Sequence, residues 1–389
     1  MKITKTEKSL LGLFLIKEIV AIFFTPFLEY PDSMAHLMRI KFYTEEKRNF
    51  YYLFLNKVYQ LTEELGFNNS IDYSWKGIFN IPLSNKMSLI YNSYIPMYSL
   101  IGMLVQLIII IFSIYLFYIF LNNDKKINEV EKHKLLKIVL IWYSMISISS
   151  LVLNISSDYL VYIYQPFFLY LLYKKKHVVN IILCLVLLKY VDNNILANIF
   201  FLYFYIILNF LEKKVKNSKT FFIISIIFII INIMILFPIG LSFNPEAELQ
   251  RESNLQVGSG KFYTKIVGIF LSSFYLGGFN QYITFKILYV IYGIFIIKVV
   301  IKMLKNKKGL IELFSIVGSI SAMMYIVRNL GHVKYFTYMN FFIIEYIFLY
   351  IFKDKDFKRS ELINNIGIGF FILTLFEVFK LFFKAYIFI

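Results

Sequence analysis

The sequence is poor in cysteine and in charge. Its single cysteine among 389 residues is Cys184, which lies inside an apolar block. One thiol excludes an intramolecular disulfide and a metal site built from several thiolates. Charged residues make up only 17% of the chain, whereas soluble domains contain roughly a quarter. The composition therefore argues against an ordinary soluble domain.

Strict alternation of apolar and polar residues is also absent, which excludes a membrane barrel. Instead 59% of the residues are hydrophobic, the mean hydropathy is +0.67, and the apolar residues form long blocks. Such blocks predict transmembrane helices, because a helix satisfies its own backbone hydrogen bonds in lipid. The predicted fold class is an all-α membrane protein, a single polytopic domain over residues 1–389.

Positive charge lies mainly in short connections between the apolar blocks. With the N-terminus in the cytoplasm, the lysine-rich connections all fall inside, as the positive-inside rule requires. These connections are 122–134, 174–177, 212–219, 304–309 and 353–360. The net charge of +17 is thereby explained without nucleic acid, which is not an expected partner.

About eleven spans are predicted, with the C-terminus outside. They are 9–27, 98–121, 135–153, 158–173, 178–191, 194–211, 220–238, 284–303, 310–327, 333–352 and 362–385. The blocks 158–173 and 178–191 are short for a full crossing.

Two long segments, 28–97 and 239–283, are predicted to form outer loops. Within the second, the apolar stretch 263–279 is expected to be re-entrant or interfacial, because a crossing would put the later lysine-rich connections outside. The span interiors contain almost no acids, which argues against a proton or ion pathway and favours binding or chemistry at the outer rim.

Ionisable residues gather on the predicted outer side. Pro31 suits a first helical position, and Asp32 and His36 are four residues apart on one helix face. The other members of this set are Asp158, Asp192, Arg251, Arg328, His332 and Lys334. Each also suits an ordinary helix end or a solvated loop. Their common placement at membrane level predicts a functional site on the outer face.

Two short motifs carry a family resemblance. The segment PDSMAHL at 31–37 resembles the first-loop P-D-E-x-A-H-[FL] signature of GT-C-type polytopic membrane glycosyltransferases, the superfamily that uses polyprenyl-phosphate sugars. The segment HVKYF at 332–336 resembles the late motif that helps to hold the lipid phosphate. A first span, a long outer loop with interfacial helices and closely spaced later spans are also similar to that superfamily. Ser33 stands where the family has Glu, and Lys334 where it has Arg.

The resemblance implies a transfer reaction at the cell membrane. A sugar would move from a polyprenyl-phosphate donor to an outward-facing envelope glycan, lipid or protein acceptor. Asp32 would be the general base, and His36 would orient it or touch the phosphate. Arg251, Arg328, His332 and Lys334 would bind the donor phosphate, with Asp158 and Asp192 as further polar groups on the outer face. No cofactor is certain, and the replaced Glu leaves a divalent metal open.

Two other functions remain open, as does a non-catalytic scaffold. A flippase or transporter of lipid-linked sugars would have charged groups deeper within the spans. A polysaccharide polymerase or ligase with the same donor usually carries arginines in a large late outer loop, where residues 239–262 offer only Arg251.

Overall fold

The computed structural model describes a chain of α-helices. The described residues are 2–24, 50–65, 95–144, 159–191, 195–215, 217–242, 294, 297–305, 307–327, 363–369, 371, 372, 375 and 379. Within these ranges no strand is present, so the predicted all-α class is confirmed.

Three helices begin at capping residues that the sequence supplies. α1 (Lys5–Phe24) starts with a reciprocal capping box, in which the Glu7 backbone N–H donates to Thr4 Oγ1 and the Thr4 N–H donates to the Glu7 carboxylate. Asn128 caps α7 (Glu129–Ser144) by accepting from the Glu131 N–H at 2.8 Å. Asn217 precedes α12 (Ser218–Ser242) and accepts from the Lys219 N–H. These side chains satisfy backbone donors that a helix start leaves unpaired.

Five further helices follow the predicted apolar blocks closely. They are α6 (Ile95–Asn123), α9 (Tyr159–Tyr173), α10 (His177–Tyr190), α11 (Leu196–Lys214) and α16 (Lys307–Val327). α10 has 14 residues and is about 21 Å long at 1.5 Å per residue, which is short of a bilayer core of about 30 Å. The expectation that the block 178–191 is short is therefore confirmed.

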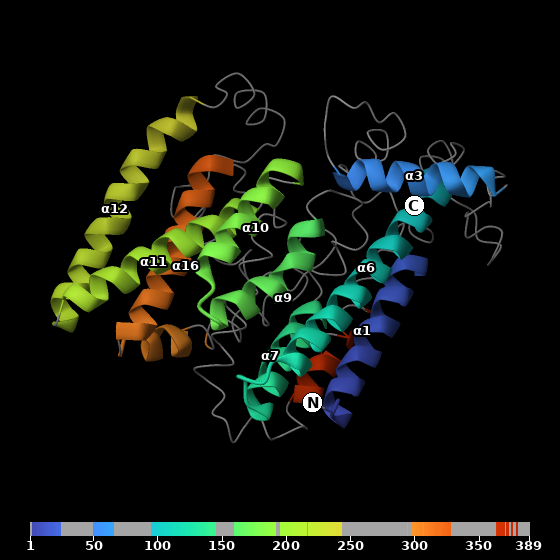
Figure 1. Ribbon diagram of the computed structural model, residues 1–389, viewed down its shortest axis with the longest axis horizontal. Coiled ribbons are helices and arrows are strands. Elements are labelled where there is room, and N and C mark those ends of the chain that lie inside the picture. Colours follow the sequence, from blue (N-terminus) through green and yellow to red (C-terminus); the bar gives the residue numbers. More distant parts are fainter. Residues whose placement is uncertain are drawn as a thin grey trace.

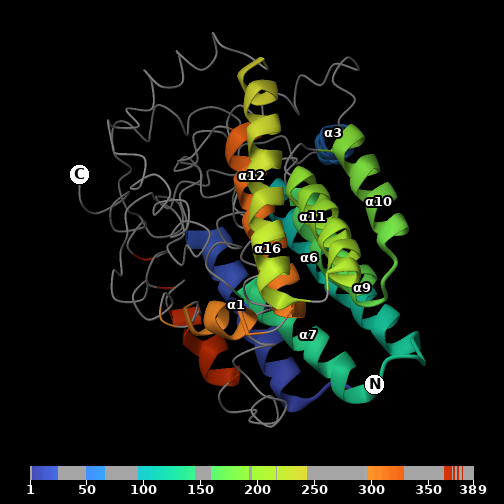
Figure 2. The same cartoon turned by 90° about the vertical axis from the view of Figure 1, so that its left-hand side faces the viewer.

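The helices form two packed groups that share α11. α1 packs against α7 and α6, α6 packs against α9, and α10 packs against α9 and α11. On the other side, α16 packs against both α11 and α12 (Figures 1 and 2). One buried apolar cluster joins α1, α3, α6, α7, α9, α10 and α11 and reaches Ile316 and Ile320 of α16, and a second joins α11, α12 and α16.

One end of the bundle collects the lysine-rich connections. His133 contacts Glu7 of α1, Lys174 contacts Asp124, and Lys307 contacts Glu212, so the N-terminus and four connections meet there. Figure 1 shows the start of α1, α7 and α16 on this lower side. We call it the lysine end.

The opposite end carries α3 (Phe50–Glu64), which lies across the axes of α1 and α6 (Figure 1). Tyr51 of α3 donates a hydrogen bond to Gln106 of α6, and both side chains are buried. Tyr52, Leu55 and Tyr59 are also buried, whereas Phe50, Leu61 and Leu65 are exposed. α3 lies within the predicted outer loop 28–97, whose interfacial placement stays a prediction, and we call this end the α3 end.

Two described helices are long and apolar enough to cross a membrane, namely Ile101–Asn123 and Leu196–Lys214. Shorter apolar helices cover Leu160–Tyr173, His177–Tyr190 and Ser218–Asn232. The count of eleven spans stays a prediction. The apolar stretch 263–279 lies outside the described residues, as does the connection 353–360.

Candidate functional site

All eight predicted site residues lie outside the described residues. These are Asp32, His36, Asp158, Asp192, Arg251, Arg328, His332 and Lys334. Their roles stay predictions. α1 ends at Phe24 at the α3 end, however, so the chain enters the segment with Asp32 from the side opposite the lysine end (Figure 1).

The described part contains a fully buried ion pair that the sequence analysis did not single out. Lys17 Nζ lies 2.9 Å from Glu18 Oε1, and the two side chains are 1% and 0% exposed. Lys17 also donates a 3.2 Å hydrogen bond to the carbonyl oxygen of Tyr143 on α7. At 1.5 Å per residue, Lys17 lies about 18 Å from the start of α1. The pair therefore sits near the middle of the predicted span 9–27.

Aromatic rings lie beside Lys17 and around Tyr143. The ring of Phe14 lies 5.6 Å from Lys17 Nζ and 6.0 Å from the ring of Tyr143. Trp142 in turn stacks on Tyr162, with ring centroids 6.1 Å apart. Burial keeps water from the two charges, so the pair depends on contacts within the protein. Glu18 is an exception to the expectation that span interiors contain almost no acids.

A second buried polar contact joins α9 to α11. Gln165 Nε2 donates to Asn198 Oδ1 at 3.0 Å, and both side chains are fully buried. Gln165 Oε1 and Asn198 Nδ2 have no hydrogen-bond partner among the described residues. A buried polar atom without a partner costs about 1–3 kcal/mol. The interior of the bundle therefore contains two polar atoms, Gln165 Oε1 and Asn198 Nδ2, whose burial lowers stability.

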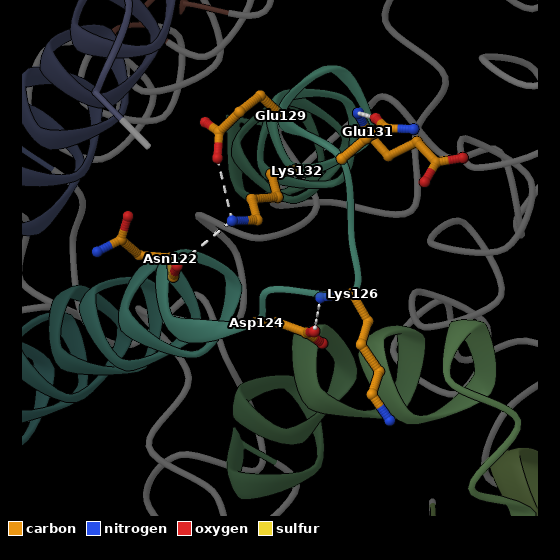
Figure 3. Close-up of polar contacts among 7 residues, drawn as sticks. Asn122, Asp124, Lys126, Glu129, Glu131 and Lys132 are labelled. Carbon is orange, nitrogen blue, oxygen red and sulfur yellow. Dashed lines mark hydrogen bonds and ion pairs between the residues drawn. The ribbon is translucent and has the colours of Figure 1, made fainter.

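At the lysine end, Asp124 ties the connection between α6 and α7 to the end of α9. Its carboxylate lies 2.5 Å from Lys174 Nζ and accepts hydrogen bonds from the Tyr170 hydroxyl and the Lys126 backbone N–H, both at 2.8 Å. Burial raises the pKa of this carboxyl, but these three donors outweigh it and lower the pKa to about 2. The Lys126 side chain points away from this contact (Figure 3).

Further polar contacts close the same end. Lys132 reaches from α7 to Glu129 at 3.1 Å and to the carbonyl oxygen of Asn122 at 3.3 Å (Figure 3). The hydroxyl of Tyr173 donates to the Glu131 carboxylate. His133 Nδ1 lies 2.8 Å from the buried Glu7 carboxylate. These contacts hold the connections at the lysine end in place, so this end is an ordered polar surface.

A cavity of about 900 Å³ opens at the lysine end between α7, α11, α16 and the turn after α9. Lys134, Lys175 and Lys308 line it together with Glu131 and Glu312. His177, the first residue of α10, has its ring 5.8 Å from that of Tyr205, another lining residue. Burial, with Lys175 nearby, lowers the pKa of His177, which favours its neutral form.

Within the described ranges, no three His, Cys, Asp or Glu side chains meet as metal ligands. Metal dependence of the predicted outer site is therefore untested. Two signals in the sequence pointed to the buried groups. Lys17 and Glu18 interrupt an otherwise apolar block, and Gln165 and Asn198 are isolated amides within two others. The cavity had no such signal, because its lysines come from three separate connections.

No family model matches the chain, and neither a curated protein nor a solved structure matches it.

Proposed function

We propose that this chain is a multi-pass membrane glycosyltransferase of the cell envelope. It transfers a sugar from a polyprenyl-phosphate donor to an outward-facing glycan, lipid or protein acceptor. The observation that carries the proposal is the motif PDSMAHL at 31–37, which follows α1 shortly after that helix ends at the α3 end. The predicted general base therefore belongs to a segment that the chain enters away from the lysine end.

Two features of the described helices support membrane insertion. α10 exposes an apolar surface of Val178, Val179, Ile182, Leu185 and Val186. α12 exposes another of Ile223, Ile227, Ile230, Ile231, Met234 and Ile235. Soluble proteins rarely expose contiguous apolar surfaces of this kind, whereas lipid covers them at no cost. The lysines gathered at one end then set that end in the cytoplasm.

In this mechanism a carboxylate removes the proton of the acceptor hydroxyl, and the acceptor oxygen bonds to the anomeric carbon of the sugar. The bond between that carbon and the donor phosphate oxygen breaks, and the lipid phosphate leaves. Asp32 is the proposed base, and Lys334, with Arg251, Arg328 and His332, stabilises the charge on the lipid phosphate. His36, four residues after Asp32, orients that carboxylate or contacts the phosphate. Asp158 and Asp192 are proposed as further polar groups of the same outer face.

The test is transfer from a polyprenyl-phosphate sugar by membranes that contain the Asp32→Asn variant. Because the substitution removes a base and keeps its shape, transfer should fall about a hundredfold to ten-thousandfold. Asp72→Asn, in the same predicted outer loop but outside the motif, is the matched control and should retain transfer. Equal expression of both variants must be shown. Wild-type transfer by Asp32→Asn would contradict the proposal.

A flippase or transporter of lipid-linked sugars is the second candidate, and one observation favours it. The buried pair Lys17–Glu18 is the type of charged group within a span that a transport pathway uses. The double variant Lys17→Met with Glu18→Gln removes both charges. If reconstituted vesicles with this variant lose translocation of a lipid-linked sugar while the protein stays folded, and Asp32→Asn retains translocation, the transporter is favoured over the enzyme.

A further inference from the structure

The cavity at the lysine end is lined by cations from three separate segments. Lys134 comes from α7, Lys175 from the turn between α9 and α10, and Lys308 from the first turn of α16. Its volume of about 900 Å³ falls within the range of ligand pockets, roughly 300–1,000 Å³. The cavity lies at the end of the bundle away from α3, so it is distinct from the outer site proposed above.

Two of these lysines differ from their sequence neighbours in their ion pairing. Lys174 pairs with Asp124, and Lys307 contacts Glu212 at 3.7 Å and the Val215 carbonyl oxygen at 2.9 Å. By contrast, Lys175 and Lys308 are exposed and form no ion pair with any residue of the described ranges. In both of these connections, one lysine forms contacts that hold the fold, and the next lysine lines the cavity.

The backbone at Lys175 is held in a conformation that favours glycine. Its φ is 55°, in the left-handed region. Lys175 N–H donates to the Leu172 carbonyl and Lys176 N–H to that of Leu171, which is the Schellman pattern that usually has glycine at this position. A lysine there costs about 1–2 kcal/mol in backbone energy. That cost is understandable if the side chain serves a ligand.

The first turn of α16 is also held in place, by a close backbone contact. A Cβ on Gly309 would lie 2.4 Å from the carbonyl oxygen of Met303, so no larger residue fits this turn. The close approach fixes the first turn of α16, and with it Lys308, against the preceding segment. Lys308 and Glu312, four residues apart, share one face of the helix and both line the cavity.

The other wall of the cavity is apolar. Leu135 and Ile138 of α7 and Leu172 of α9 line it, and all three are buried. Glu131 also lines the cavity, but its carboxylate accepts a hydrogen bond from Tyr173. Cationic ammonium groups beside an aliphatic wall, at the lysine end of the bundle, are complementary to a phosphate that is attached to acyl chains.

We propose that this cavity binds a phosphate group, with Lys175 and Lys308 as its principal cations, and that an anionic phospholipid headgroup supplies the phosphate. Lys134 is the third cation around the same group. The aliphatic wall receives the first part of an acyl chain. Because the ligand is held by charge, its binding weakens at high ionic strength.

The test uses the full chain in phosphatidylcholine nanodiscs with and without phosphatidylglycerol. Retained phosphatidylglycerol is measured by native mass spectrometry, and the stabilisation it gives is measured by thermal unfolding. The cavity variant is Lys175→Gln with Lys308→Gln. The charge-matched control is Lys126→Gln with Lys305→Gln, two exposed lysines of the same end that do not line the cavity.

At about 1 kcal/mol per lysine, affinity for phosphatidylglycerol should fall roughly fivefold for each cavity substitution and about thirtyfold for both. The control should bind as the wild type does. Because Gln does not favour a positive φ, Lys175→Gly is a second variant that keeps the turn, and it should lose the same roughly fivefold.

A separate arm adds inorganic phosphate to the protein in phosphatidylcholine alone. Lysine-dependent stabilisation by phosphatidylglycerol, but not by inorganic phosphate, supports a lipid headgroup. Equal lysine-dependent stabilisation by inorganic phosphate would keep the phosphate site and overturn the lipid as its source. An equal loss in the cavity variant and in the control would overturn the site itself, because the lysines would then act only through surface charge.

Discussion

The interior of the bundle and its lysine end use the same kinds of polar side chain under opposite conditions. Lys17 and Glu18 are almost fully excluded from solvent, and the ring of Phe14 lies beside Lys17. Lys174 and Asp124 form the same type of pair at the lysine end, where their side chains remain 18% and 8% exposed. A charge in the interior cannot be hydrated when its partner is removed, whereas a charge at the lysine end can. Breaking the same type of ion pair should therefore reduce stability much more in the interior than at the lysine end.

The largest effect is expected from breaking the interior pair. Lys17→Met leaves the Glu18 carboxylate buried without its lysine, which should destabilise the protein by about 3–5 kcal/mol. Adding Glu18→Gln removes the remaining charge and should restore most of that loss. Thermal unfolding of the purified protein in detergent measures both variants. A double variant no more stable than Lys17→Met would show that the charge imbalance is not the cause.

The next effect concerns apolar packing between α11 and α16. A Cβ on Gly318 would lie 2.7 Å from the ring of Phe204, so Gly318→Ala should destabilise the protein by about 1–3 kcal/mol through overpacking. Gly12→Ala is the control, since nothing lies within 4 Å of its Cβ position. That change should be neutral or stabilise by up to about 1 kcal/mol, because alanine favours a helix. Equal melting temperatures for the two variants would contradict the packing of this interface.

A smaller effect is expected at Asp124, and it depends on pH. Its pKa is lowered from 3.8 to about 2, so its contribution to stability is fully present above about pH 4. That contribution is lost as the pH falls towards 2, when the carboxyl becomes protonated in the folded state. Asp124→Asn should cost roughly 1 kcal/mol at neutral pH and should flatten the pH dependence of unfolding between pH 2 and 4. An unchanged pH profile would show that Asp124 does not form these contacts in solution.

The smallest effect, and the only stabilising one at the lysine end, is expected from Lys175→Gly. Relief of the positive φ should raise the free energy of unfolding by about 1 kcal/mol, although the loss of chain rigidity offsets part of it. Lys176→Gly, one residue later, lies outside the left-handed position and should not stabilise. A chemical denaturation series of the two variants tests this. Destabilisation by Lys175→Gly would mean that the lysine side chain itself supports the fold.

Much of the secondary structure was predictable because long apolar helices carry a strong one-dimensional signal. The blocks 98–121 and 194–211 correspond to α6 and α11 within a few residues. α7 begins at Glu129, six residues before the predicted block at 135, because Asn128 caps a polar first turn that hydropathy does not detect. The grouping of the four described lysine-rich connections at one end was also anticipated from their charge, while 353–360 lies outside the described residues.

The sequence alone determined that the chain is helical, where most helices begin and end, and which connections gather the lysines, because these depend on local composition and capping. The predicted outer site rests on motifs and stays a prediction. Only the tertiary structure decided that Lys17 and Glu18 are buried and that Lys17 donates to the Tyr143 carbonyl oxygen of α7. It also decided that Lys134, Lys175 and Lys308 face one cavity. Both outcomes depend on how helices distant in sequence pack together. The hydropathy of the sequence does not predict which helix faces contact each other.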